Sequence, residues 1–264
     1  MNREFIARHW YAYIYERQED YTQDVELLLR VLDEQSGASL NILEVACGGG
    51  RIAVPLARAG HRVTGFDADE HMLMRCYVRA DDLGNLRVFK ADAVLDDWGE
   101  GYDAVILGAN FLINIESGED YAKAQETVVL KAGAALVPGG FLFMDFDMHY
   151  DPAAVFNKLE EYSYFQGTDD FGTYGCMFGY GSVYNPVTRV CTGSNHMEIT
   201  TKGGESFIVP RQWHKHIPTQ GQVWDWLGAA GLAVERTYRN FTDEPVPIPI
   251  DEGIFRITLV ARKV

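Results

Sequence analysis

Basic residues are scarce in this chain, which has 23 lysines and arginines against 38 aspartates and glutamates and a formal net charge of −15. Such a negative field repels phosphate backbones and anionic lipid surfaces, so we expect neither nucleic acid nor a membrane as partner. No apolar run reaches the roughly 18 residues that a membrane-spanning helix needs. Residues 1–5 show no apolar signal-peptide core, and we expect a cytoplasmic protein.

Cysteine is also sparse, with four residues that lie far apart and form no C-x-x-C pair: Cys47, Cys76, Cys176 and Cys191. This spacing predicts reduced thiols and does not support a zinc site, nor do the histidines near residues 196–216 have convincing ligand spacing. A chain of 264 residues is long enough to bury a core without disulfides or metal. We therefore predict no metal.

A short apolar run at residues 42–45 leads into three consecutive glycines, Gly48, Gly49 and Gly50, and residues 51–57 then have the character of a helix start. A strand that turns through glycine into a helix leaves backbone N–H groups facing the turn. Glycine also lets a ligand approach the main chain without meeting a Cβ atom. The stretch therefore predicts a cradle for a nucleotide.

Apolar strand segments and helical segments alternate along most of the chain. Strands are expected at residues 42–45, 61–66, 86–90, 102–107 and 141–146, and helices after the glycines, at 69–79 and at 119–136, before the turn signal at 138–140. Continuous apolar strands separated by helices indicate a parallel sheet covered on both faces. The sequence thus predicts an α/β fold built on a parallel sheet with helices on both faces.

This alternation is interrupted between residues 150 and 216. A helix is expected at 151–162, followed by strands at 174–184, 189–200 and 205–214, with turns between them. We predict an inserted β meander that serves as a lid, an acceptor contact or a contact between two copies in a homodimer. Residues 1–149 and 217–264 are assigned to the α/β core, where a helix and two last strands complete the chain.

Two ligand classes fit the glycine turn. Residues 48–53 match G-x-G-x-x-A, which is typical of dinucleotide-binding dehydrogenases, so an NAD(P)-dependent oxidoreductase is one alternative. Three features oppose it: a charged residue, Glu44, lies inside the strand, two strands follow the last helix, and the meander interrupts the second half. Two matching mononucleotide-binding halves are not visible.

The glycine turn and the motifs that follow it resemble those of the class I S-adenosylmethionine-dependent methyltransferases. Residues 44–50 are similar to their first motif, E/D-x-x-x-G-x-G, and Asp67 ends the second strand where they carry a ribose-binding acid. Asp92 and Ala93, residues 138–140 and the two closing strands also match. The resemblance covers roughly residues 17–146 and 222–262, and is greatest to small-molecule enzymes with a β insert, such as sugar N-methyltransferases and glycine N-methyltransferases.

The resemblance implies a Rossmann-like, seven-stranded, mostly parallel sheet with an antiparallel last strand, plus a small antiparallel insert after the fifth strand. It implies S-adenosylmethionine as cofactor and S-adenosylhomocysteine as product. Asp67 is expected on the ribose, Asp92 and Ala93 on the adenine, and Glu44 near the methionine ammonium. The alternative without a ligand is that Asp67 caps a helix and Asp92 forms a turn. The full predicted cofactor set is Arg17, Tyr21, Glu44, Ala46, Gly48, Gly50, Asp67, Ala68, Met72, Asp92, Ala93, Gly108 and Asn110.

The predicted reaction is in-line transfer of a methyl group to a nitrogen or oxygen of a small molecule. An oxygen acceptor or a protonated amine needs a base, and His149 after the fifth strand is the first choice because imidazole titrates near neutral pH. Tyr15 is the second catalytic candidate, since it precedes the helix that leads to the glycine strand. A non-catalytic adenosylmethionine-binding module is the remaining alternative, and the sequence does not identify the acceptor.

Overall fold

The computed structural model describes residues 2–19, 22–35, 38–115, 120–242, 244–247, 250 and 256–264. The chain divides into two compact units, one formed by residues 1–20 and 151–217 and the other, the core, by residues 21–150 and 218–264. Tyr21, one of the predicted site residues, lies outside the described residues. Among the described helices, none combines the length and apolar character required to cross a membrane.

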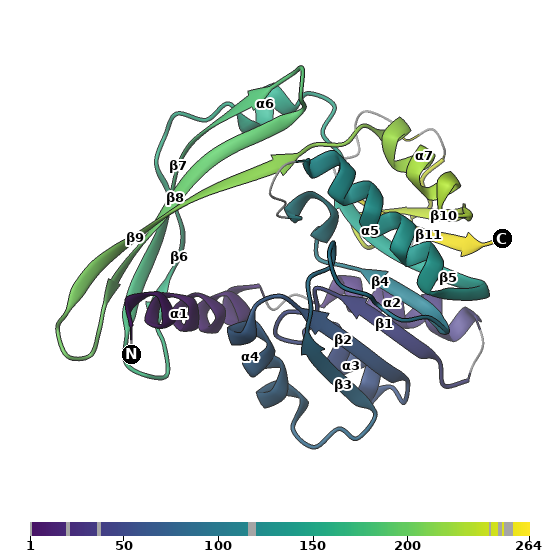
Figure 1. The fold of residues 1–264 in the computed structure, drawn as a ribbon, viewed down its shortest axis with the longest axis horizontal. Coiled ribbons are helices and arrows are strands. Elements are labelled where there is room, and N and C mark those ends of the chain that lie inside the picture. Colours follow the sequence, from purple (N-terminus) through teal and green to yellow (C-terminus); the bar gives the residue numbers. More distant parts are fainter. Residues whose placement is uncertain are drawn as a thin grey trace. The chain divides into compact units, whose positions relative to one another are not determined.

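The core is built on a seven-stranded sheet with the strand order β10-β11-β5-β4-β1-β2-β3 (Figure 1). All neighbours from β5 to β3 are parallel, while β11 runs antiparallel to both β5 and β10. The predicted fold class, with its antiparallel last strand, is confirmed. The strands are β1 (Asn41–Val45), β2 (Arg62–Asp67), β3 (Leu86–Lys90), β4 (Tyr102–Leu107), β5 (Leu136–Asp147), β10 (Leu232–Arg239) and β11 (Arg256–Lys263).

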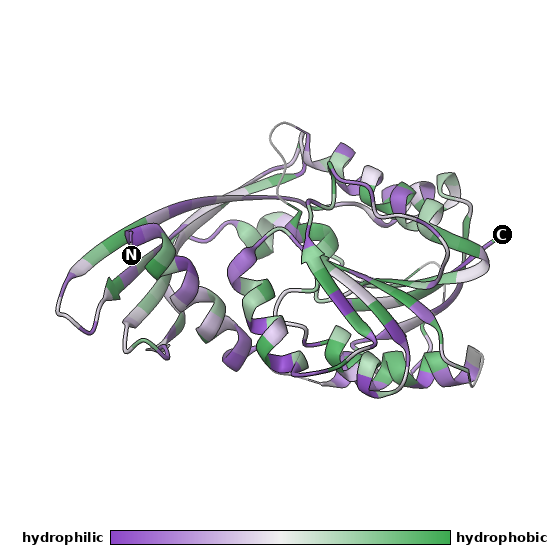
Figure 2. Cartoon of the chain, turned by 60° about the horizontal axis from the view of Figure 1, so that its bottom comes forward, coloured by the Kyte–Doolittle hydropathy of each residue, from purple (hydrophilic) through white to green (hydrophobic). Residues whose placement is uncertain are grey.

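Helices cover both faces of this sheet, because the side chains of each strand point alternately to its two faces and both faces are apolar. On one face the core is closed by α5 (Tyr121–Ala135) and α7 (Gln220–Ala229), and on the other by α2 (Gln23–Gln35) and α3 (Ala53–Arg58). The remaining core elements are α4 (Glu70–Ala80) and a short 3-10 turn, Phe111–Asn114. Figure 2 shows hydrophobic and hydrophilic stretches alternating along the helices, as expected for helices with one buried face.

The predicted turn at residues 138–140 is part of a strand. Pro138, Gly139 and Gly140 lie inside β5, where the pairing with β4 shifts between Tyr102 and Ala104. Gly139 takes a positive φ of 78°, so the turn signal produces a bulge without ending the strand. The fifth strand therefore starts at Leu136, five residues earlier than predicted.

The second unit contains a four-stranded antiparallel sheet in the order β6-β7-β8-β9. The predicted helix at 151–162 is much shorter: α6 (Pro152–Phe156) ends where Asn157 Oδ1 accepts the Tyr184 N–H at 2.9 Å, and a strand follows that was not predicted. Alternation of side chains in Tyr-Ser-Tyr-Phe-Gln was its sequence signal. The strands are β6 (Tyr162–Thr168), β7 (Tyr174–Asn185), β8 (Val190–Thr200) and β9 (Ser206–His216).

The N-terminal helix α1 (Arg3–Gln18) belongs to this second unit, which corrects the assignment of residues 1–20 to the core. Its buried face, Ala7, Trp10 and Ile14, packs on Met177 and other residues of the antiparallel sheet. Trp10 is fully buried, donates from Nε1 to the Gly167 carbonyl at 2.9 Å, and occupies space that a Cβ atom at position 175 would need. The helix and the insert thus share one apolar core.

Candidate functional site

The glycine turn combines left-handed backbone with two glycines that have different surroundings. Ala46, Gly48 and Gly50 have φ values of +54°, +51° and +75° between the end of β1 and α3. A Cβ atom on Gly50 would lie 2.6 Å from the Cys76 Sγ in α4, whereas on Gly48 it would meet nothing within 4 Å. Gly50 is therefore required by packing against Cys76, and the space beside Gly48 is open.

Asp67 joins the tips of three neighbouring strands. Its Oδ2 accepts the Gly48 N–H at 2.9 Å and its Oδ1 accepts the Asp69 N–H at 2.8 Å, while its carbonyl accepts from Ala91 at 3.1 Å. Burial raises the pKa of Asp67, and the two backbone N–H groups oppose that rise. The cap of α4 is Asp69, whose side chain accepts from the His71 N–H, so Asp67 itself is not the helix cap.

At the tip of β3, Asp92 forms a turn. Its Oδ1 accepts the N–H groups of Val94 and Leu95 at 2.8 and 3.0 Å, and its own N–H donates to Asp96 Oδ2 at 2.8 Å. One carboxylate oxygen is thus engaged in the turn, as a turn-forming aspartate requires. The backbone that follows, from Ala93, is the segment that we expect on an adenine ring.

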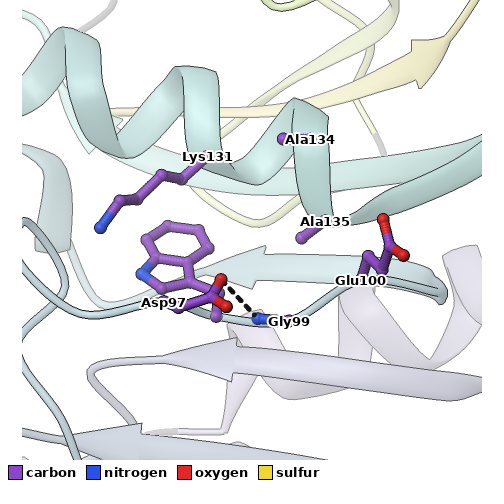
Figure 3. Close-up of a pocket in the computed structure, with 7 residues that line it drawn as sticks. Asp97, Gly99, Glu100, Lys131, Ala134 and Ala135 are labelled. Atoms are coloured by element: carbon purple, nitrogen blue, oxygen red, sulfur yellow. Dashed lines mark hydrogen bonds between the residues drawn. The ribbon is translucent and has the colours of Figure 1, made fainter.

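Lys131 of α5 fixes this segment from the other side. Its Nζ donates to the carbonyls of Val94 and Asp96 at 2.7 Å and of Ala93 at 3.2 Å, and Trp98 Nε1 donates to the Ala93 carbonyl at 3.0 Å. Burial lowers the pKa of Lys131, although nearby aspartates oppose the effect. Figure 3 shows Lys131 extending from α5 above the loop.

The same loop and helix line a cavity of about 320 Å³ (Figure 3). Its lining includes Asp97, Gly99 and Glu100, which directly precede β4, together with Ala134 and Ala135 at the end of α5. These residues lie where β4 begins, at the amino end of the parallel strands. Ligands of open α/β sheets bind at the carboxyl ends, so this cavity is distinct from the candidate site.

Glu44 lies below the glycine turn and is buried, with 3% of its surface exposed. Burial raises its pKa well above the ordinary 4.5, and the Arg51 guanidinium only partly opposes this. Its Oε2 has no hydrogen-bond partner among the described residues. Arg51 itself is held by the buried Asp24 of α2 through two hydrogen bonds of 2.6 and 2.7 Å. The glycine turn is therefore followed by an ion pair to the buried Asp24, close to a carboxyl with one oxygen that lacks a partner among the described residues.

A second polar group occupies the tips of β4 and β5. Asn110 donates its N–H to Asp145 Oδ2 at 3.0 Å, and its side chain exchanges two hydrogen bonds with Asp147 at 2.7 and 2.9 Å. Arg256, the first residue of β11, pairs with Asp145 at 2.5 Å and with Asp147 at 3.4 Å. Burial raises the pKa of Asp145 to about 6 against the effect of Arg256. Gly108 lies at the same strand end, and the Ile52 side chain fills the space that a Cβ atom at position 108 would need.

Three of these groups were missed from the sequence: the Asp24–Arg51 pair, the Asp145–Arg256 pair and Lys131. Asp145 had a signal, since it is a charge inside the apolar run Phe-Leu-Phe-Met-Asp-Phe, just as Glu44 is a charge inside β1. The other two had none, because a lysine or aspartate on a surface helix shows no distinctive pattern. Ala109 and Asn110, both left-handed with φ of 55° and 59°, mark the β4 tip as strained.

The other predicted residues lie as follows. His149 is buried two residues after β5, Ala68 is exposed and Met72 is half-buried on α4. Tyr15 and Arg17 lie on α1 in the other unit, where Tyr15 packs edge-on against Phe165 at 5.8 Å and Arg17 stacks over the Tyr13 ring at 4.4 Å. Hydrogen bonds thus join Gly48 after β1 to Asp67 of β2, and the Asp67 carbonyl to Ala91, the residue before Asp92. Roles for His149, Tyr15 and Arg17 stay predictions.

A glycine turn at a strand tip, with an acid bonded to it from the next strand, is an arrangement that open α/β sheets use to hold nucleotides. Residues 42–140 match the methyltransferase domain family. The ubiquinone biosynthesis O-methyltransferase of Mesorhizobium japonicum is 34% identical over 108 residues, 40% of each chain. Residues 42–140 are thus similar to a methyltransferase domain, and the chain spans about two fifths of the length of the curated relatives it matches.

Solved structures extend the likeness in fold to nearly the whole chain. An S-adenosylmethionine-dependent methyltransferase from Clostridium acetobutylicum has a TM-score of 0.74 at 13% identity, with 99% of both chains covered. The sugar N-methyltransferase KedS8 from Streptoalloteichus has a TM-score of 0.69 at 16% identity, covering 93% of this chain and 89% of that one. The predicted resemblance to class I methyltransferases is confirmed, in sequence for the domain and in fold for the rest.

Proposed function

We propose that this protein is an S-adenosylmethionine-dependent methyltransferase that transfers a methyl group to a nitrogen or oxygen atom of a small molecule. The observation that carries the proposal is the bond between Gly48 N–H and Asp67 Oδ2, which places a carboxylate beside the open side of the glycine turn. A carboxylate there accepts from ribose hydroxyls, and each charged hydrogen bond contributes on the order of 1.5–3 kcal/mol.

The residues present fit this cofactor. The buried Oε2 of Glu44 lacks a partner among the described residues, and an ammonium group nearby would provide both a donor and a compensating charge. Gly48 leaves space for the ligand, and the Asp92 turn presents backbone to a base. When bound, S-adenosylmethionine supplies an electrophilic methyl group on a sulfonium, and S-adenosylhomocysteine remains as product. Glu44, Gly48, Asp67 and the segment at Asp92 and Ala93 would hold it.

What the chain must add is positioning and a proton acceptor. In-line displacement from an activated donor is accelerated by orientation, so a rigid strand-tip network such as Asn110, Asp145 and Arg256 suits the task. We assign the base to His149, which follows the carboxyl end of β5 and takes a proton from the acceptor nitrogen or oxygen. Tyr15, on α1, is retained as the second catalytic candidate.

The acceptor is proposed to be a small neutral or cationic molecule, which the acidic balance of the chain favours. Oxygen and nitrogen are both retained as targets, because the curated relative named above is an O-methyltransferase and KedS8 is a sugar N-methyltransferase. A screen of amines, sugars and phenols with isotope-labelled donor, read by mass spectrometry, tests this. Label in no acceptor, with intact donor binding, would favour a non-catalytic binding module.

The cofactor assignment is tested with Asp67→Asn, which keeps the shape of the side chain and removes its charge. We expect affinity for S-adenosylhomocysteine, measured by calorimetry, to fall by more than about tenfold, since at least one charged hydrogen bond to ribose is weakened. Asp82→Asn is the matched control, because Asp82 is exposed after α4 and its change leaves the strand tips intact. Equal affinities in both variants would reject the ribose assignment, and tight binding of NADH instead would support the dehydrogenase alternative.

A further inference from the structure

Three metal-ligating side chains gather in the unit formed by residues 1–20 and 151–217. His9 comes from α1, and Asp169 and Asp170 come from the hairpin that joins β6 to β7. One ring nitrogen of His9 and one carboxylate oxygen from each aspartate all lie within 4.8 Å of one another. Two ligands that are each about 2.1 Å from one ion lie at most about 4.2 Å apart, so small side-chain movements would bring all three onto a single ion.

Asp169 supplies the observation that a ligand belongs here. It is buried, with 6% of its surface exposed, and its Oδ1 accepts the N–H groups of Phe171 and Thr173 at 3.0 and 2.7 Å. Its Oδ2 is buried as well and has no hydrogen-bond partner among the described residues. A buried carboxylate oxygen without a partner costs free energy, which a bound cation would recover.

His9 is oriented for coordination. Its ring is buried and stacks on Phe171 with 4.1 Å between ring centroids and 10° between planes, which fixes the plane of the imidazole. Its Nε2 lies 2.6 Å from Asp170 Oδ1, so both atoms point at the same small volume. The side chain of Asp170 is 42% exposed, which leaves a path for an ion and for water ligands.

We propose that His9, Asp169 and Asp170 bind one divalent transition-metal ion, with Zn²⁺ or Mn²⁺ as the expected class. A single imidazole with two carboxylates is a mixed nitrogen and oxygen donor set, which suits such ions better than the all-oxygen cages preferred by Ca²⁺. The ion would link α1 to a hairpin 161 residues away in sequence and so stabilise the unit that they form. Its role is structural and is independent of methyl transfer.

A bare ion pair between a protonated His9 and Asp170 is the competing explanation. It satisfies Asp170 but leaves Asp169 Oδ2 buried without a partner. The two explanations therefore differ in what Asp169 does: it is a ligand in one and only a turn former in the other. Asp169→Asn separates them, because the amide retains an oxygen for the N–H groups of Phe171 and Thr173 and loses the charge.

The experiment uses the full chain, stripped with EDTA, dialysed and titrated with ZnCl₂ and then MnCl₂ by calorimetry. We expect one ion per chain, a rise in the melting temperature with Zn²⁺, and at least a tenfold loss of affinity in Asp169→Asn. Glu160→Gln is the matched control, since it removes one carboxylate charge from an exposed site in the same unit and should bind as the wild type does.

Asp170→Asn, at a more exposed position, provides a second variant if Asp169→Asn fails to fold, and it should also lose at least tenfold in affinity. Co²⁺ provides an independent readout, because coordination by imidazole and carboxylate changes its visible absorption. The proposal is overturned if the wild type takes up neither Zn²⁺ nor Mn²⁺, or if both aspartate variants bind them as tightly as Glu160→Gln does.

Discussion

The two units of this protein distribute their polar groups differently. In the core, strands β1 and β5 are largely apolar, and their charged residues lie near the carboxyl ends, as Glu44 and Asp145 do. In the second unit, the strands are long and antiparallel, one sheet face is covered by α1, and several aromatic side chains are exposed: Tyr162, Tyr164, Tyr174 and Tyr180. The core therefore buries charged residues of its strands, whereas the second unit exposes several of its aromatic side chains.

The difference between the units coincides with the extent of the similarity to known methyltransferases. The match to the methyltransferase domain family runs from residue 42 to residue 140, which is β1 to the first part of β5, and includes none of the second unit. We therefore expect donor binding to depend on the core and acceptor choice to depend on the insert with α1. The predictions below test this division.

The largest expected effect is on the second unit alone. Trp10→Ala should lower the free energy of unfolding of that unit by about 3–5 kcal/mol, because a fully buried indole is removed from the contact between α1 and the sheet. Urea titration followed by circular dichroism measures this. Affinity for S-adenosylhomocysteine should change less than twofold, and a large loss in the folded variant would show that the two units are energetically coupled.

Within the core, the two outer glycines of the turn should respond differently. Gly50→Ala should destabilise the protein by about 1–3 kcal/mol, since its Cβ would overlap the Cys76 Sγ. Gly48→Ala should cost only about 1 kcal/mol, the penalty of the left-handed backbone, but should reduce donor affinity because it fills the open side of the turn. Thermal unfolding and calorimetry, done on both variants, distinguish these effects; equal stability losses would contradict the packing role of Gly50.

We expect Glu44→Gln to make the protein more stable at pH 8 but to weaken cofactor binding. Folding raises the pKa of Glu44, so the folded protein retains a proton that the unfolded chain releases. The resulting stability is fully present below the unfolded pKa near 4.5 and is lost as pH rises through the folded pKa. The variant should therefore be more stable than wild type by about 1 kcal/mol at pH 8 and should lose less stability between pH 5 and pH 8.

The same variant should bind S-adenosylhomocysteine more weakly, because the charge that faces the ammonium is gone. Unfolding by urea at a series of pH values, together with calorimetry, gives both quantities. A Glu44→Gln protein that is less stable than wild type at pH 8 would contradict the buried, unsatisfied state of this carboxyl.

The smallest effect is expected from Lys131→Met, which keeps the length of the side chain and removes the donor to three loop carbonyls. Because the segment after Asp92 is then less well fixed, affinity for S-adenosylhomocysteine should fall about threefold, equivalent to about 0.7 kcal/mol. Lys123→Met on the exposed side of the same helix is the control. Calorimetry of both variants is sufficient, and identical affinities would show that the loop holds its shape without Lys131.

Much of the core could be predicted from local sequence patterns. Strands buried on both faces are continuous apolar runs, and a turn with left-handed backbone favours glycine. Asp67 was predicted at a strand tip and lies there, bonded to Gly48. The interactions of Arg51 and Lys131 were not predicted, because their partners are 27 residues or more away and are determined by tertiary packing. Local patterns do not encode which distant acid or carbonyl a long side chain will meet.

The placement of α1 failed for a related reason. The helix is rich in aromatic residues such as Trp10, Tyr11 and Tyr13, and such a helix can pack on any complementary apolar surface. Gly175 and Gly167, which make room for Trp10 and accept its hydrogen bond, lie more than 150 residues further along the chain. The grouping of His9, Asp169 and Asp170 could not be predicted for the same reason, since its members meet only when the helix packs on the sheet.

The position of β11 has a consequence for how the protein is made. This strand comes last in the sequence but lies between β5 and β10, and it carries Arg256 to Asp145. During synthesis from the amino terminus, β10 lacks its partner strand and Asp145 lacks the guanidinium of Arg256 until β11 has been made. The edge of β5 that pairs with β11 is therefore open during that interval.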